Sequence, residues 1–227
     1  MCTIKARLDK VLTRIRQAEI QFERAPNSVK LLAVSKTKPL SEIQAAINCG
    51  QLEFGENYLQ DALSKIKALN HNKVKWHFIG HVQSNKARQV AENFSWVHTV
   101  DSIKLARRLS RFVADGKPAL NVCIQINISN EKNKSGCNIE SALELAQEIE
   151  KLENLNLRGL MAIPMPETDF AAQRSVFRDL NSIYQDFKAK GIKLDTLSIG
   201  MSADLEAAIA EGATIVRVGT DIFGPRS

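Results

Sequence analysis

The sequence of 227 residues has no long apolar segment and only four cysteines, and each scarcity excludes a class of protein. No window approaches the roughly 18 apolar residues that span a membrane. Residues 1–22 mix acids and bases throughout and lack the compact apolar region of a signal peptide. The cysteines form no CxxC pair, and their spacings suit neither a zinc site nor a disulfide framework. These absences predict a cytoplasmic protein with reduced thiols.

The chain is basic, with a formal net charge of +6, but its positive charge is not concentrated. Lysines and arginines alternate with acids along helical faces, without a long basic run or aromatic–basic interleaving. This pattern argues against nucleic-acid binding and favours a solvated surface, with some charge left for a small anionic ligand. We expect no metal site from the four histidines, and we expect His77 to be a core histidine with a hydrogen-bond partner.

An amphipathic segment opens the chain, and short apolar runs alternate with helical patterns after it. Leu8, Val11 and Ile15 share one helical face, so residues 1–25 are predicted to form a covering helix. The apolar runs are LLAVS, LEFGE, KWHFIG, WVHTVD, ALNVCIQIN, LRGLMAI, TLSIG and TIVRVG. Because strands alternate with helices, we expect parallel strands joined by right-handed crossovers.

The number of strand–helix units predicts an α/β fold of the (β/α)8 TIM-barrel type. The barrel would occupy residues 30–225 of a single domain that spans residues 1–227. A doubly wound open sheet is the alternative, but we would expect such a sheet to have a strand followed by a GxGxxG turn, which the sequence lacks. Functional groups of such barrels sit at the C-terminal ends of the strands, so the last residues of each apolar run are the candidates.

Lys36 closes the first apolar run, where an ammonium group is unexpected. Leu32, Val34 and Lys36 share one face of a strand, so Lys36 would continue the row that lines the barrel. Partial loss of hydration favours the neutral amine, which forms Schiff bases with aldehydes. A lysine that extends from a strand end into water is the better explanation for Lys36 taken alone. Lys38 is equally available by composition but lies beyond the strand, beside Pro39.

Two glycine turns near the C-terminus favour a phosphate ligand. The segment SIGMSADLEAAIAEG passes through Gly200 into a helix whose expected N-cap is Ser202, and helix N-termini bind phosphate. The segment VRVGTDIFG supplies Gly219 and the Thr220 hydroxyl. Loops after strands seven and eight frequently bind phosphate in such barrels. Each turn alone is explained by capping or chain reversal, but both turns together with Lys36 favour a phosphate-bearing aldehyde.

Arg217 lies in the last apolar run, and we expect its side chain to point into the barrel. Gly219 on the same face would let a ligand approach closely. A buried guanidinium needs a partner and keeps its proton, so beside a pyridine nitrogen it would donate a hydrogen bond. An internal ion pair with Glu56 or Asp101 is the alternative. Asn57, after the second run, would either contact the ligand ring or cap the following helix.

Together these stretches resemble the pyridoxal phosphate homeostasis protein family, also called YggS/PROSC. The segments that match occur in order along nearly the whole chain, and their combination is highly specific. They are LLAVSKTKP, FGENYLQ, KWHFIGHVQSNK, VDSIKLA, QINISNEKNKSG, LRGLMAIP, LSIGMSADLEAAIAEGATIVRVGT and IFGPR. The resemblance implies a barrel like the N-terminal domain of alanine racemase.

The resemblance also implies a cofactor and the roles of the candidate residues. Lys36 would hold pyridoxal 5′-phosphate (PLP) covalently through a Schiff base. Ser202, Gly219 and Thr220 would hold the phosphate, and Arg217 would face the pyridine nitrogen. Members of this family are not known as enzymes and are associated with vitamin B6 balance, so no catalytic residue is expected.

The sequence departs from the family's pattern at a few positions. Val82 stands where leucine is more usual. Asp221 follows the phosphate loop where a smaller uncharged residue is expected, and an inward carboxylate would weaken phosphate binding. The chain ends at Ser227, where relatives often run on, which leaves a role of C-terminal lysines open.

We therefore expect a non-catalytic protein that carries or buffers PLP in intracellular vitamin B6 homeostasis. The alternative is a PLP-dependent amino-acid racemase, which would need a second base from another domain and a partner subunit. The chain ends with the barrel, and neither Tyr58 nor Tyr184 is in a natural position for that base. A third interpretation is a Schiff-base aldolase without a cofactor. We expect a monomer with at most a weak dimer, whose partners are PLP and apo-PLP-dependent enzymes, and neither nucleic acid nor a membrane.

Overall fold

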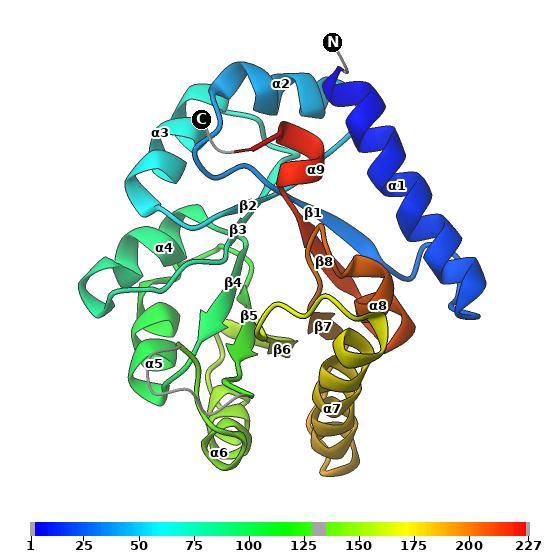
Figure 1. Ribbon diagram of the computed structural model, residues 1–227. Coiled ribbons are helices and arrows are strands. Elements are labelled where there is room, and N and C mark those ends of the chain that lie inside the picture. Colours follow the sequence, from blue (N-terminus) through cyan, green and yellow to red (C-terminus); the bar gives the residue numbers. More distant parts are fainter. Residues whose placement is uncertain (1–2, 129–134, 226–227) are drawn as a thin grey trace.

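Parallel strands close into a barrel in the computed structural model, which describes residues 3–128 and 135–225 (Figure 1). The strands are β1 (Lys30–Val34), β2 (Glu53–Glu56), β3 (Lys75–Phe78), β4 (Trp96–Val100), β5 (Leu120–Gln125), β6 (Leu155–Met161), β7 (Thr196–Ser198) and β8 (Ile215–Val218). Each strand pairs with its neighbours in the sequence, and β1 closes the barrel against β8. The predicted (β/α)8 barrel is confirmed.

Helices follow the strands and form an outer layer around the barrel (Figure 1). They are α2 (Leu40–Asn48), α3 (Leu59–Leu69), η1 (Ser84–Lys86), α4 (Ala87–Asn93), α5 (Ile103–Phe112), α6 (Ile139–Ile149), α7 (Phe170–Ala189), α8 (Leu205–Ala210) and α9 (Thr220–Phe223). Their apolar faces and the outward side chains of the strands form one core. None of the helices in the described ranges has the length and apolar character needed to cross a bilayer.

The predicted N-terminal helix is present as α1 (Ile4–Gln21), and it lies outside the barrel strands (Figure 1). Thr3 caps it, because the Thr3 side chain accepts a hydrogen bond from the Ala6 N–H at 3.3 Å. Leu8, Val11 and Ile15 are buried as the helical pattern predicts, which contributes about 1.5–3 kcal/mol for each side chain. The helix packs against α8 and α9, so it braces the last two units of the barrel.

Side chains that alternate along the strands divide between the outer core and the barrel interior. In β8, Val216 and Val218 belong to the outer core, whereas the buried Arg217 between them faces inward. A separate apolar group in the interior comprises Trp96, Cys123 and Met161. Buried polar residues of the strands include His77, His98, Ser198 and Arg217. This interior is more polar than the layers of bulky branched residues that dominate most such barrels.

A buried ion pair fixes the C-terminal end of β1. The Glu56 side chain is fully buried, and its Oε1 accepts hydrogen bonds from Ser35 Oγ at 2.6 Å and from Lys65 Nζ at 2.8 Å. Lys65 Nζ also donates to the Ser35 carbonyl at 2.9 Å and to Asp61 at 2.7 Å. Burial raises the pKa of Glu56, although Lys65 and Ser35 oppose that rise. The pair therefore holds Ser35, the residue directly before Lys36.

We expect Lys65→Ala to lower the free energy of unfolding by about 3–5 kcal/mol, because Glu56 would stay buried without its cation. Urea denaturation measures this change. Lys67→Ala removes an exposed lysine from the same helix and is the matched control, with an expected change of about 0.5 kcal/mol or less. Equal effects of the two substitutions would contradict a structural role of the buried pair.

The two buried histidines predict a loss of stability in mild acid. Burial lowers the pKa of His77 well below its ordinary value of 6.5 and lowers the pKa of His98 to about 3. Below about pH 6.5 the unfolded chain therefore binds protons that the folded chain does not, and unfolding becomes more favourable. Between about pH 7 and about pH 5.5, the free energy of unfolding should fall by about 1 kcal/mol for each buried histidine.

Urea denaturation at these two pH values is the measurement, and substitutions of single histidines provide the control. His98→Gln should remove roughly half of the histidine-linked fall. His81→Gln, at an exposed position, should leave the fall unchanged. A stability that does not depend on pH in this window, or equal pH dependence in both variants, would contradict the assignment.

Candidate ligand site at the mouth of the barrel

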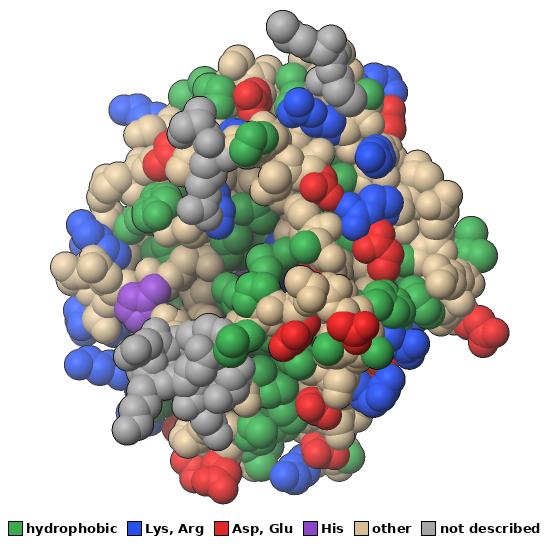
Figure 2. Space-filling model, in the orientation of Figure 1, with side chains coloured by type: hydrophobic (Ala, Val, Ile, Leu, Met, Phe, Trp, Pro, Cys, Tyr) green, Lys and Arg blue, Asp and Glu red, His purple; other side chains and the backbone are tan. Residues whose placement is uncertain are grey.

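A cavity of about 410 Å³ opens at the C-terminal ends of the strands. All the binding residues proposed from the sequence line it, namely Lys36, Asn57, Ser202, Arg217, Gly219 and Thr220. Its apolar wall includes Val34, Ile79, Ile163 and Met201. Figure 2 shows that the molecule is hollowed near the centre of the corresponding face and that hydrophobic side chains border the hollow. The fold thus brings together residues that are up to 184 positions apart in the sequence, from position 36 to position 220.

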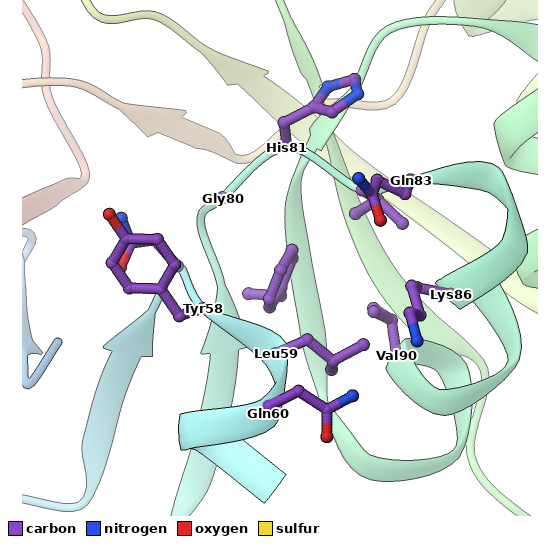
Figure 3. A pocket seen from close by; sticks show the side chains of 11 residues that line it. Tyr58, Leu59, Gln60, Gly80, His81, Gln83, Lys86 and Val90 are labelled. Atoms are coloured by element: carbon purple, nitrogen blue, oxygen red, sulfur yellow. The ribbon is translucent and has the colours of Figure 1, made fainter. Parts of the chain in front are cut away.

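A second cavity of about 560 Å³ lies beside the first and shares Asn57 and Gly80 with it (Figure 3). The Lys86 and Gln60 side chains extend toward each other at one end of this cavity, and Tyr58 lies at the opposite end (Figure 3). Its lining includes neither the strand-end lysine nor the buried guanidinium. We therefore take the smaller cavity as the candidate site, because the chemically distinctive groups converge there.

Lys36 lines the cavity because the chain turns just after β1. Ser35 is fully buried and held by the ion pair described above. Thr37 has a φ of +63°, in the left-handed region that a β-branched residue seldom occupies, and this conformation turns the chain. Lys38 also lines the cavity, but its Nζ donates a hydrogen bond to the Pro225 carbonyl at 2.7 Å.

The expectation that Ser202 is the N-cap of a helix is wrong. Helix α8 starts at Leu205, and Asp204 occupies the N-cap position. Residues 202–204 form a turn instead, in which the Asp204 carboxylate accepts a hydrogen bond from the Met201 N–H at 2.5 Å. The sequence pattern placed the helix too early because aspartate competes with serine for capping and turn positions. Ser202 still lines the cavity, as part of this turn.

Gly219 is tightly packed at the junction of β8 and β1. A Cβ atom at this position would lie 3.1 Å from the Val34 carbonyl oxygen and 3.3 Å from Val34 Cβ. The sequence argument expected this glycine to allow the approach of a ligand, and the structure adds the approach of a neighbouring strand. Helix α9 begins at Thr220, directly after it. The second turn therefore lies against the end of β1, where Lys36 follows.

Arg14 of α1 connects the two turns, and no sequence pattern pointed to it. Its Nη1 donates to Asp221 at 2.5 Å, and its Nε and Nη2 donate to the Glu206 carboxylate at 2.7 and 2.9 Å. Nη2 also donates to the Ser202 carbonyl at 3.0 Å. These partners raise the pKa of Arg14, and the hydrogen bond to Glu206 is the largest cause. Asp221 is thus paired with Arg14 and is not among the residues that line the cavity.

Arg217 is buried, and neither predicted carboxylate is its partner. Its Nη1 donates to the Ser198 carbonyl at 2.5 Å and to Ser198 Oγ at 3.0 Å, and its Nη2 donates to the Ala162 carbonyl at 2.9 Å. Glu56 pairs with Lys65 instead, and Asp101 lies 4.0 Å from His81. Burial lowers the pKa of Arg217 to about 10, so the guanidinium stays charged at neutral pH.

Asn57 does not cap the helix that follows it. The N-cap of α3 is Tyr58, and no side chain caps this helix. Asn57 Oδ1 is instead a buried acceptor without a hydrogen-bond partner in the described part of the chain. Such an atom costs free energy unless a ligand or water satisfies it, so its position in the cavity wall favours a bound ligand.

Sequence reasoning also missed the side chains behind Arg217. Ser198 Oγ lies 2.9 Å from His98 Nδ1, and His98 Nε2 lies 3.0 Å from His77 Nδ1. The expectation of a buried His77 with a hydrogen-bond partner is confirmed, and that partner is His98. Part of the family-matching segment QINISNEKNKSG, residues 129–134, lies outside the described residues.

Comparisons with known proteins agree with this geometry. The family model for the alanine racemase N-terminal domain matches residues 7–227. A pyridoxal phosphate homeostasis protein of Pseudomonas aeruginosa is 52% identical over 226 residues, which cover 100% of this chain and 97% of that protein. A protein of the same name from Escherichia coli K12 is 48% identical over 229 residues and is covered to 98%.

Solved structures lead to the same family. PipY of Synechococcus elongatus PCC7942, solved with PLP bound, has a TM-score of 0.85 and 34% identity, and the match covers 98% of this chain and 100% of PipY. The chain therefore belongs to the alanine racemase N-terminal domain family and, within it, to the pyridoxal phosphate homeostasis proteins.

Proposed function

We propose that the protein binds PLP in the 410 Å³ cavity, covalently through Lys36, and that it carries or buffers PLP without catalysing a reaction. The observation that carries this proposal is the convergence on one cavity of a strand-end lysine, two glycine turns and a buried guanidinium. The PLP bound in PipY supports it, since that protein is 34% identical to this chain. The cavity volume lies within the range of roughly 300–1,000 Å³ that small-ligand sites occupy.

The residues of the cavity suit the functional groups of PLP. PLP supplies an aldehyde, with which an unprotonated lysine amine forms an imine. Ser202, Gly219 and Thr220 would hold the phosphate through backbone N–H groups and hydroxyls. Arg217 would donate a hydrogen bond to the ring nitrogen, and the unpartnered Oδ1 of Asn57 would accept one from the bound ligand or its water.

A guanidinium at the ring nitrogen favours storage over catalysis. Arg217 stays protonated and can only donate, so a ring nitrogen in contact with it would stay unprotonated. An unprotonated ring draws electrons less strongly than the pyridinium that a carboxylate partner would stabilise. This feature supports the proposal without carrying it.

The racemase alternative would need a second base beside the reacting carbon. Among the described residues that line the cavity, the ionisable side chains are Lys36, Lys38 and Arg217. Tyr58 is exposed and lines the neighbouring cavity, and Tyr184 is buried in α7. Neither tyrosine is placed to act as that base, which supports a non-catalytic role.

We further propose that residues 1–227 act as one PLP-binding domain in the cytoplasm, as a monomer or at most a weak dimer. Apo-PLP-dependent enzymes are the expected recipients. Loops line the mouth of the cavity, and the cofactor would be held by an imine, which forms reversibly. Both features suit exchange of PLP with such recipients.

Borohydride reduction of the PLP-loaded protein tests the covalent assignment. We expect a yellow protein with absorbance near about 420 nm, and after reduction a pyridoxyl adduct on Lys36 in peptide mass spectrometry. Lys36→Ala should lose the adduct and the colour. Lys38→Ala, which changes the other lysine of the same cavity, should keep both.

Three outcomes would contradict the proposal. An adduct on Lys38 would move the covalent site. A colourless protein that forms no adduct would favour the aldolase interpretation. Production of D-amino acids from L-amino acids that is lost in Lys36→Ala, measured by chiral chromatography, would replace the carrier by a racemase.

Arg14→Ala tests whether the connection between the two turns matters for PLP affinity. The substitution removes the hydrogen bonds to Ser202 and Asp221, so both turns lose their common anchor and the Asp221 carboxylate becomes free to approach the phosphate. We expect PLP affinity to fall about tenfold, allowing for the partial exposure of this cluster. Absorbance titration with PLP measures the dissociation constant.

Lys10→Ala is the control for this prediction, because Lys10 is an exposed cation on the same helix. Its PLP affinity should equal that of the unmodified protein. Unchanged affinity in Arg14→Ala would show that the turns hold the phosphate without α1.

A further inference from the structure

We propose that Ser198, His98 and His77 form an ordered hydrogen-bonded chain through the barrel interior, which positions Arg217 for its contact with the ligand ring. The three are positioning residues that act through Arg217. The proposal rests on the proposed PLP site only for its effect on the cofactor, since the chain itself is a property of the protein alone.

The chain runs from the cavity toward the N-terminal ends of the strands. Arg217 Nη1 donates to Ser198 Oγ at 3.0 Å, Ser198 Oγ lies 2.9 Å from His98 Nδ1, and His98 Nε2 lies 3.0 Å from His77 Nδ1. His77 Nε2 lies 3.6 Å from Glu53 Oε2, at the start of β2, which is too far for a hydrogen bond, and Nε2 has no hydrogen-bond partner among the described residues. The strands β8, β7, β4 and β3 thus contribute one member each, and β2 places a carboxylate beside the end of the chain.

The two ends of the chain set its direction. A guanidinium only donates hydrogen bonds, and an ionised carboxylate only accepts them. His77 Nε2 faces the Glu53 carboxylate without a hydrogen bond between them, and the charges of Lys75 and Lys30 also act on this ring. We place the proton on Nε2, toward the nearest acceptor, so His77 Nδ1 accepts. His98 Nε2 must then donate, His98 Nδ1 accepts, and the Ser198 hydroxyl donates to it while its oxygen accepts from Arg217. Every bond therefore points from the cation toward the carboxylate.

The middle of the chain is neutral. Both imidazoles are fully buried, and burial holds the pKa of each well below neutral pH. No carboxylate hydrogen-bonds to Arg217 among the described residues, and the charge of Asp204 acts on it only through space. A contacting carboxylate would compete with the ligand for the N–H groups of Arg217. The neutral chain orients the guanidinium without competing with the ligand for its free N–H groups.

The hydrogen bonds of Arg217 fix the orientation of its guanidinium. The two N–H groups of Nη1 are directed to the carbonyl and hydroxyl oxygens of Ser198, and one N–H of Nη2 is directed to the Ala162 carbonyl. The guanidinium has five N–H groups, so these three bonds fix its plane and leave two donors. Because Arg217 also lines the cavity, those donors are the ones that can meet a ring nitrogen.

A simpler explanation is that the histidines only fill the interior. His77 stacks on Trp96 with ring centroids 5.3 Å apart and an interplanar angle of 7°, as a filler would. A filler does not require one tautomer of each imidazole, whereas the ordered chain does. The tautomers therefore separate the two explanations.

The first measurement is a long-range ¹H–¹⁵N correlation spectrum of the imidazoles in ¹⁵N-labelled protein without PLP. We expect His77 and His98 each to carry one proton, on Nε2, at about pH 6 to about pH 8. His98→Gln and His77→Gln assign the signals. A proton on Nδ1 of either ring, or an imidazolium in this range, would overturn the ordered chain.

The second measurement tests positioning with Ser198→Ala, which removes only the hydroxyl. We expect the His98 Nδ1 signal to shift, PLP affinity to fall about tenfold and the absorption maximum of the bound cofactor to move. Ser110→Ala, a buried serine outside the cavity, should change none of these. Unchanged affinity and absorption in Ser198→Ala would overturn the positioning role.

The two measurements distinguish failure of this inference from failure of the proposed function. If PLP does not bind the unmodified protein, the proposed function fails, but the tautomers still decide whether the chain exists. If Ser198→Ala does not fold, the spectrum of the unmodified protein remains the deciding test, and the wrong tautomer there overturns the inference.

Discussion

A charged guanidinium inside the barrel is the constraint on which the rest of the site depends. Removing a charge from water is costly unless hydrogen bonds replace the lost hydration. Arg217 meets this requirement with neutral oxygens of Ser198 and Ala162, within the described part of the chain. The interior must therefore be polar on this side, which explains why histidines occupy strand positions that are aliphatic in most barrels.

Contacts outside the barrel hold the other parts of the site in place. The Glu56–Lys65 pair secures the end of β1, from which Lys36 follows. Arg14 secures both turns near the C-terminus from the opposite side. Each anchor comes from a helix, and the anchored groups follow β1 or lie in the two turns after β7 and β8. The barrel thus supplies the position of the site, and the helices supply its rigidity.

The sequence predicted what depends on local order and missed what depends on distant partners. Alternating apolar runs and helical patterns gave the barrel, and strand periodicity placed Arg217 inside. The boundary at Ser202 was wrong because serine and aspartate are both good capping residues within three positions. The bonds of Arg14 to Asp221 and of His98 to Ser198 join residues about 100 to 200 positions apart, and no periodicity signals such pairs.

The state of the cofactor's ring nitrogen tests the central claim most directly. The ¹⁵N spectrum of the protein loaded with PLP labelled at that nitrogen reports whether the nitrogen carries a proton. Because Arg217 stays charged at neutral pH and can only donate, we expect the ring nitrogen to be unprotonated and hydrogen-bonded. Its signal should change in Arg217→Lys. A pyridinium signal in the unmodified protein would contradict the account, because a guanidinium and a protonated ring nitrogen cannot share a hydrogen bond.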